Sequence, residues 1–226
     1  WPDIAQKIQA DLKEIKIDVK IVTSEDREFP EPRPFRGHAW EVARHLIHVG
    51  GDLTLARDLA LPEAAVEKGV KALKMGAPIL ADTRMVRAGI ADRRVKALGG
   101  TIECLRTQPG VTSAAIRAGI PRSRAAMFLA EPKYMGAIVV LGGAPASLLT
   151  LMEMMDDMFS LTSRPTLIIG MPAGFADAAE AKALLEASPW TMLTVRGSKG
   201  GPALAAAAAN ALMEIALRER EREGSL

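Results

Sequence analysis

All three histidines of the chain lie between positions 38 and 48, and histidine is the side chain that both gives and takes a proton near neutral pH. The last of them, His48, ends the segment 40–48, in which apolar residues recur every three or four positions. That spacing predicts a short amphipathic helix, and Gly50 and Gly51 supply its stop signal. His48 therefore falls in the last turn of a predicted helix.

The position of His48 suits acid–base chemistry. The negative end of a helix dipole favours the imidazolium form by roughly 0.3–1 kcal/mol. A histidine that stays charged there can protonate a molecule bound beside it. The alternative is a histidine that only caps the last carbonyl groups of its own helix. Asp52 is a candidate to orient the ring, provided that the turn after the helix folds back.

A second signal comes from three glycine-bearing turns that each follow an apolar strand, at 142–145, 170–175 and 196–201. Such turns lie together at the carboxyl ends of an open parallel sheet, where ligands bind. Glycine lets a ligand approach the backbone, and helix N-termini present free N–H groups to anions. Arg196 and Lys199 add positive charge, so we predict a crevice for a large anionic ligand.

The same turns allow other interpretations. None of them has the spacing of a P-loop or of the dinucleotide-binding fingerprint, so a nucleotide site is not indicated. Each turn taken alone is also compatible with an ordinary tight connection between a strand and a helix. Asp82, Thr83 and Arg84 follow a further strand and should join the same rim, which favours a real crevice.

Short apolar strands alternate with helices along most of the chain. Strands are predicted at 77–81, 102–105, 137–141, 166–169 and 192–195. Helices are predicted at 62–76, 113–118, 122–129, 148–159, 176–187 and from Pro202 to about residue 223. This alternation predicts an α/β fold, a three-layer α/β/α arrangement around a mostly parallel sheet of about five strands.

The N-terminal part differs from the rest. Residues 1–35 are predicted to hold a helix over 4–15, a strand over 17–21 and a charged, Pro-rich arm over 24–34. The α/β domain is predicted to span residues 36–226.

The composition of the chain indicates the class of protein and the compartment in which it works. The chain of 226 residues is 49% hydrophobic and carries a net charge of +2, which is too small to favour nucleic acid as a partner. It has no run of 18 apolar residues, and its start lacks the basic and apolar regions of a signal peptide. The single cysteine, Cys104, is predicted to be a buried, inert thiol in a reducing cytoplasm.

Six segments of the sequence, in this order, resemble the precorrin-8X methylmutase family and its cobalt-dependent counterpart. They are residues 40–48, 76–86, 122–127, Gly142-Gly143-Ala144-Pro145, 170–175 and 195–201. Together they run from about residue 36 to residue 217. Each segment alone is a weak signal, but six in one order with family-like spacing indicate membership.

The resemblance implies a chemistry. The family moves a methyl group from C-11 to C-12 of a corrin-type macrocycle by a sigmatropic shift, and its proton donor and acceptor matches His48. The substrate carries many carboxylates, which charge-assisted hydrogen bonds from arginine would hold. The implied substrate-binding residues are Arg44, His45, Arg84, Arg122, Arg124, Gly142, Gly143, Arg196 and Lys199. No redox cofactor or catalytic metal is implied, and cobalt, if present, arrives within the substrate.

The sequence also departs from the family's pattern. His45 stands where the family usually has a second, substrate-contacting arginine, and Gly143 stands where it usually has asparagine. Val49 and Gly50 replace small polar residues that commonly follow the catalytic histidine, and Pro121 replaces a threonine. These changes leave the fold and ligand class as expected and bear on the substrate and the rate.

Two classes of function compete at this point. The first is an isomerase that acts on a precorrin, and the second is a non-catalytic binder or carrier of a tetrapyrrole. A homodimer is expected in either case, because a broad corrin disc needs a second surface to cover it. The Pro-rich arm at 24–34 and the helix with Met152, Met154, Met155 and Met158 are candidates for that cover, although core packing is the simpler role for these methionines.

Overall fold

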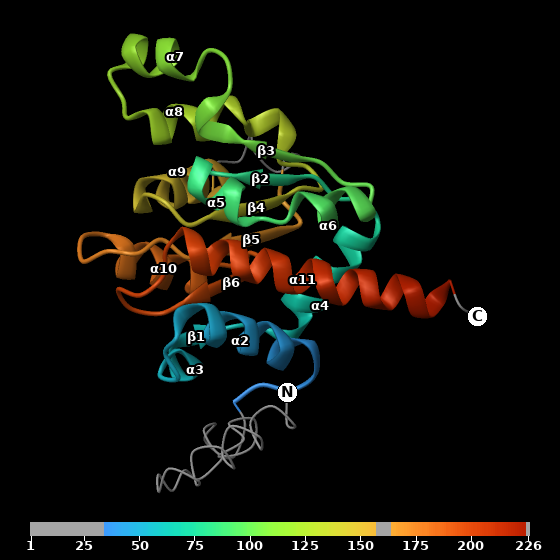
Figure 1. Cartoon of the computed structure of the whole chain (residues 1–226). Coiled ribbons are helices and arrows are strands. Elements are labelled where there is room, and N and C mark those ends of the chain that lie inside the picture. Colours follow the sequence, from blue (N-terminus) through green and yellow to red (C-terminus); the bar gives the residue numbers. More distant parts are fainter. Residues whose placement is uncertain (1–33, 157–163, 225–226) are drawn as a thin grey trace, which may run out of the picture. The chain divides into compact units, whose positions relative to one another are not determined.

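The computed structural model of the chain describes residues 34–156 and 164–224, and its central feature is a six-stranded sheet (Figure 1). The strand order is β1-β6-β5-β4-β2-β3. The strands are β1 (Leu59–Ala60), β2 (Ile79–Ala81), β3 (Ile102–Cys104), β4 (Ile138–Leu141), β5 (Leu167–Gly170) and β6 (Met192–Val195). All neighbouring pairs are parallel except β1 with β6. The predicted mostly parallel α/β sheet is confirmed.

The sequence missed one strand, β1. It has only two residues, so it is too short to show an alternating pattern. Leu59 pairs with Val195 of β6, and the N–H of Arg196 donates to the carbonyl of Asp58 at 2.7 Å. Long-range pairing therefore creates this strand.

Twelve helical segments, ten α-helices and two 3-10 turns, accompany the sheet in the described residues. The longer ones are α2 (Gly37–Gly50), α4 (Glu63–Lys74), α7 (Val111–Ala118), α8 (Arg122–Leu129), α9 (Pro145–Asp156), α10 (Ala178–Ala187) and α11 (Pro202–Glu223). The shorter ones are α3 (Leu55–Asp58), α5 (Arg84–Gly89), α6 (Asp92–Ala97) and two single 3-10 turns, η1 (Leu105–Thr107) and η2 (Glu131–Lys133). Each predicted helix from residue 62 onward is present, although α9 begins at Pro145 rather than Leu148 because proline suits a first helical turn.

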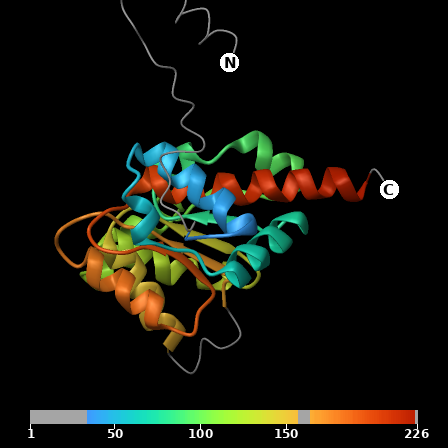
Figure 2. The same cartoon turned by 90° about the horizontal axis from the view of Figure 1, so that it is seen from below.

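Helices cover both faces of the sheet, as Figure 2 shows with α11 and α2 on one side and α10 on the other. On one face of the sheet, α8, α9 and α10 pack against Leu80, Val139 and Ile168, which belong to three adjacent strands. On the other side, a Cβ at Gly69 of α4 would lie 2.7 Å from the Leu167 side chain of β5. Burial on both faces explains the uninterrupted apolar runs of the central strands.

The methionines of α9 belong to this core. Met152, Met154 and Met155 are all buried within the chain, so core packing is confirmed for them. They are not available to cover a ligand or a second subunit, and Met158 lies outside the described residues. Cys104 is partly exposed rather than buried, because β3 is an edge strand.

The predictions for the helix at 4–15, the strand at 17–21 and most of the Pro-rich arm lie outside the described residues. Within the part of the chain that is described, no helix is both long and apolar enough to cross a membrane.

Candidate active site

A cavity of about 730 Å³ opens at the carboxyl ends of the parallel strands. Its walls come from the segments that follow β2, β3, β4 and β5, together with α8 and the start of α11. The lining residues are Thr83, Arg84, Met85, Arg106, Thr107, Arg122, Gly143, Ala144, Pro145, Ala173 and Pro202. This is the edge at which an open parallel sheet binds ligands, and the volume lies in the usual range for small-molecule sites.

Three arginines give the cavity its charge. Arg84, Arg106 and Arg122 all line it and all are exposed. Within residues 34–156 and 164–224, no carboxylate pairs with any of these three guanidinium groups. An arginine without an internal partner keeps its donors for a ligand, and its planar fork matches a carboxylate. The cavity is therefore suited to a polycarboxylate.

Asp82 holds one wall of the cavity in place. Its buried carboxylate accepts hydrogen bonds from the N–H of Gly143 at 2.7 Å and of Gly142 at 3.4 Å. Burial raises the pKa of this carboxyl, and the two N–H donors act in the opposite direction. The side chain thus fixes the turn after β4 to the end of β2.

The first turn of α11 lies between this wall and the end of α2. A Cβ at Gly142 would lie 2.8 Å from the Cα of Pro202, so the turn after β4 touches the start of α11 directly. On the other flank, a Cβ at Gly50 would lie 3.6 Å from the Leu204 side chain. The end of α2 therefore packs beside the helix start whose first residue lines the cavity.

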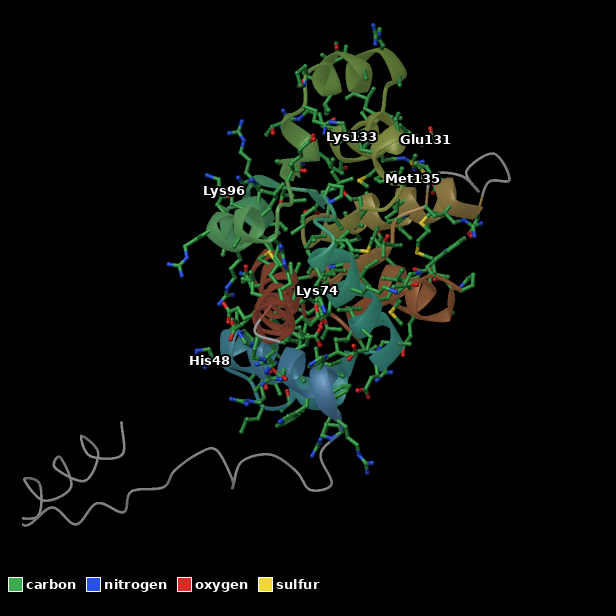
Figure 3. The ribbon with its side chains drawn as sticks, turned by 90° about the vertical axis from the view of Figure 1, so that its right-hand side faces the viewer. His48, Lys74, Lys96, Glu131, Lys133 and Met135 are labelled. Atoms are coloured by element: carbon green, nitrogen blue, oxygen red, sulfur yellow. The ribbon has the colours of Figure 1, made fainter. Side chains whose placement is uncertain are left out.

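His48 occupies the last turn of α2, as the sequence predicts. Gly51 ends the helix with φ of 60°, and its N–H donates to the carbonyl of His48. The His48 ring is exposed at the surface (Figure 3) and hydrogen-bonds to none of the described residues, so it does not cap its own helix. His48 is not among the residues that line the cavity in this single chain.

Asp52 does not orient His48. Its carboxylate binds the Lys199 ammonium at 2.8 Å and the Thr54 N–H at 2.9 Å. These hydrogen bonds, first of all that from Lys199, lower the pKa of Asp52 to about 2. The turn after α2 is thus fixed to the loop after β6.

The other predicted residues of the anion rim already have partners. Arg196 forms a two-pronged ion pair with Glu186, and Arg124 reaches Glu153 at 2.7 Å. Lys199 binds Asp52 and lies 3.2 Å from Asp58. None of the three lines the cavity.

Of the residues near the histidine, Arg44 is exposed, and His45 faces Glu214 at 3.4 Å. The structure thus brings Arg84, Arg122 and Gly143 together at the cavity, and Gly142 lies in the same turn without being a lining residue. The side chains that do not line the cavity are those of Arg44, His45, Arg124, Arg196 and Lys199. Sequence reasoning missed Arg106. Arg106 directly follows the predicted strand at 102–105, and this position could have indicated that it lies at the same edge of the sheet as Arg84.

Comparison with known proteins identifies the family and the fold. The family model for precorrin-8X methylmutase matches residues 17–215. The chain belongs to the precorrin-8X methylmutase family. Methylmutases of this family are isomerases, so the sequence resemblance and the predicted class of enzyme are confirmed.

The chain is similar to individual members of the precorrin-8X methylmutase family over most of its length. The precorrin-8X methylmutase of Pseudomonas aeruginosa is 38% identical over 176 residues, which cover 76% of this chain and 82% of that protein. The cobalt-precorrin-8 methylmutase of Priestia megaterium is 31% identical over 86% of this chain and 85% of that protein. The solved precorrin-8X methylmutase of Thermus thermophilus superposes with a TM-score of 0.75 and 34% identity, covering 84% of this chain and 91% of its own.

Proposed function

We propose that this chain moves a methyl group from C-11 to C-12 of precorrin-8X or cobalt-precorrin-8. The product is hydrogenobyrinic acid or cobyrinic acid, so the reaction belongs to cobalamin biosynthesis. The observation that carries the proposal is the set of Arg84, Arg106 and Arg122 around the cavity of a methylmutase fold. Three arginines that pair with no carboxylate among the described residues match a macrocycle that is edged with carboxylates.

His48 is the proposed proton donor and acceptor. Its ring is exposed and hydrogen-bonds to none of the described residues, so it is available to a bound macrocycle. Protonation of the ring-C region polarises the conjugated system, the methyl group then migrates, and the same imidazole takes the proton back.

The proposed reaction needs no redox cofactor and no catalytic metal. A methyl shift within one molecule changes neither the atom count nor the overall oxidation state, and the proton is returned at the end. Cobalt, in the cobalt-containing substrate, would be carried by the macrocycle itself.

We further propose that the working unit is a cytoplasmic homodimer. A corrin is a broad apolar disc, and the cavity of one chain can hold only part of it. His48 lies outside the lining of that cavity, although its helix end packs beside the cavity wall at α11. A second subunit would supply the surface that closes the disc against His48. The single, unpaired cysteine fits a reducing compartment.

The alternative, a carrier that binds a tetrapyrrole without changing it, is not favoured. The curated relatives to which the chain is similar are methylmutases, and similarity extends over most of their length.

The proposal is tested by incubating the purified chain with precorrin-8X and with cobalt-precorrin-8 in separate reactions. We expect at least one of the two substrates to be converted. The absorbance spectrum and chromatography of the product measure the conversion. Titration with hydrogenobyrinic acid and with its cobalt form reports binding independently. Tight binding of product without turnover of either substrate would reject the isomerase and favour the carrier.

A further inference from the structure

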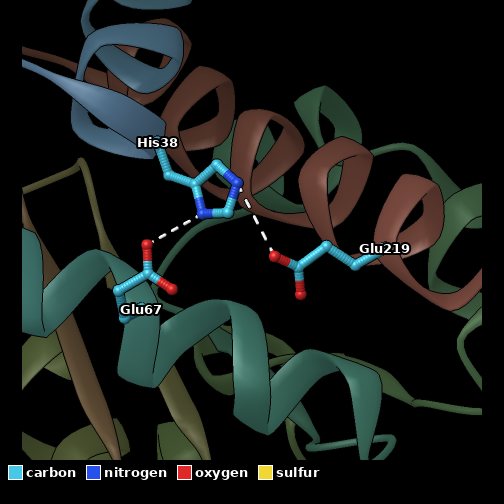
Figure 4. A group of neighbouring side chains, drawn as sticks. All are labelled: His38, Glu67 and Glu219. Atoms are coloured by element: carbon cyan, nitrogen blue, oxygen red, sulfur yellow. Dashed lines mark hydrogen bonds and ion pairs between the residues drawn. The ribbon is translucent and has the colours of Figure 1, made fainter. Parts of the chain in front are cut away.

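His38, near the start of α2, lies between two glutamates from two other helices (Figure 4). Its Nδ1 is 2.8 Å from Oε1 of Glu67 on α4, and its Nε2 is 3.6 Å from Oε1 of Glu219 on α11. One ligand atom from each of the three residues lies within 4.8 Å of the others. This cluster lies outside the cavity and takes no part in the proposed reaction.

The two contacts of the His38 ring differ in kind. The 2.8 Å contact with Glu67 is a hydrogen bond, in which Nδ1–H donates to the carboxylate. A neutral imidazole has one N–H, so this bond leaves Nε2 with a lone pair directed at a second carboxylate. At 3.6 Å the contact with Glu219 is too long for a hydrogen bond. The electron-rich atoms His38 Nε2 and Glu219 Oε1 then face each other, and a cation bound between them would make this arrangement favourable.

Glu219 keeps one oxygen for this role. Its Oε2 accepts from the Lys74 ammonium at 3.1 Å, while Oε1 is the atom that faces His38. His45 offers an instructive contrast, because the atom that it faces, Oε2 of Glu214, already binds Arg94 at 2.7 Å. A cation at His45 would compete with a guanidinium for the same oxygen, and a cation at His38 would not.

We propose that His38 Nε2 and Glu219 Oε1 bind a divalent transition-metal ion of the zinc type, with Glu67 orienting the ring. Two ligands in a tetrahedral zinc site, with bonds of about 2.0–2.1 Å, lie roughly 3.4 Å apart, close to the 3.6 Å found between Nε2 and Oε1. A carboxylate that accepts from the other ring N–H is the usual support of a metal-bound histidine. All three side chains are partly exposed, so water completes the coordination.

The local charge also favours a divalent ion. Among the described ion pairs of this group, Glu67 and Glu219 contact His38, and Glu219 and Glu223 contact Lys74. Three carboxylates and one ammonium leave this group two negative charges when the imidazole is neutral. An ion at this position would join α2 to α4 and α11. Because it binds only the folded arrangement of three helices, it would raise the free energy of unfolding.

The test is calorimetric titration of the full, untagged chain with Zn²⁺ at pH 7.5, after treatment with a chelator. One equivalent is expected to bind, and the melting temperature of the protein is expected to rise with Zn²⁺ concentration. His38→Gln and Glu219→Gln should each weaken binding by at least roughly 100-fold, because each removes a ligand. Glu67→Gln should weaken it by about tenfold, because the amide oxygen still accepts from Nδ1–H.

The matched controls are His45→Gln and His48→Gln. Together with His38 and Cys104 they account for all imidazole and thiol groups of the chain, so competing sites can be counted. Both controls should bind Zn²⁺ like the parent, and melting without metal will show that every variant is folded. A parent chain that binds no Zn²⁺ at about 1 mM would overturn the proposal. Unchanged binding by folded His38→Gln would overturn it as well.

Discussion

The carboxylate of Asp82 accepts a hydrogen bond from the backbone N–H of Gly143 at 2.7 Å, which joins the end of β2 to the turn after β4. The approach is so close that a Cβ at Gly143 would lie 2.7 Å from that carboxylate oxygen and 2.5 Å from Cγ2 of Thr83. This hydrogen bond therefore depends both on the buried carboxylate of Asp82 and on the absence of a side chain at position 143. Thr83 and Gly143 both line the cavity, so this contact sets the distance between two of its walls.

Gly143→Ala should lower the free energy of unfolding by about 1–3 kcal/mol, because the new methyl group overlaps atoms that are packed against the turn. Denaturant unfolding followed by circular dichroism measures the loss. Thr83→Ser removes Cγ2 and keeps the hydroxyl that caps α5, so the double variant should recover part of the stability. Losses that simply add in the double variant would show that Thr83 is not the obstacle.

His48→Ala should abolish methyl migration and leave the fold intact, because the ring is exposed and contributes nothing to the core. Turnover of precorrin-8X or its cobalt form measures activity, and the melting temperature measures the fold. His45→Ala is the matched control for loss of a neighbouring imidazole and should retain measurable turnover. A His48→Ala enzyme that works at the parent rate would remove His48 from the mechanism.

Arg84→Ala, Arg106→Ala and Arg122→Ala should each weaken binding of the reaction product by roughly 10-fold, since each removes a charged hydrogen-bond donor. Absorbance titration with hydrogenobyrinic acid gives the affinity. Binding should also weaken as salt rises, because the contacts are partly exposed.

Arg196→Ala and Lys199→Ala are the comparison variants for the three arginines of the cavity. From the sequence both should weaken binding, whereas in the structure both side chains are held by carboxylates outside the cavity. We therefore expect smaller effects from them than from the three arginines of the cavity. Equal effects from all five substitutions, or affinity that does not change with salt, would argue against the cavity as the site.

Lys182 should make stability depend on pH in the alkaline range. Its side chain is 1% exposed, and its ammonium donates to the carbonyl of Lys199. Burial lowers the pKa of Lys182 from the ordinary lysine value of 10.5 to about 8. Between these two values the unfolded chain binds more protons than the folded one, so this residue makes the folded state more stable as pH rises.

Between pH 7.5 and pH 10 the Lys182 effect on the free energy of unfolding is on the order of 2–3 kcal/mol. Denaturant unfolding of the parent and of Lys182→Met at pH 7.5 and pH 10 isolates it from other titrating groups. The parent should gain stability relative to the variant between the two pH values. Parallel pH profiles for the two proteins would contradict a buried, charged lysine.

The homodimer is tested by light scattering at micromolar concentration, with and without hydrogenobyrinic acid. Twice the chain mass of 24.1 kDa is expected, with an interface that buries at least roughly 1,000 Å² in total. The methionines of α9 are buried in their own core, so that helix should not supply the cover. A particle of one-chain mass under both conditions would exclude the dimer.

The sequence alone determined much of this protein. Buried parallel strands must be apolar on both faces, so β2, β4, β5 and β6 could be located from composition over a few residues. Helix stop signals are equally local, which is why His48 was correctly placed in a last turn before Gly51. The order of the six family segments carried the identity of the fold before any contact was known.

Tertiary structure decided what the charged side chains do. Arg84, Arg106, Arg122 and Arg196 look alike in the sequence, because each follows a strand or opens a helix. Only the packing shows that Arg196 meets Glu186 and that the other three face a cavity without a carboxylate partner in the described residues. An ion pair depends on which surfaces meet in the folded chain, and the local sequence pattern does not contain that information.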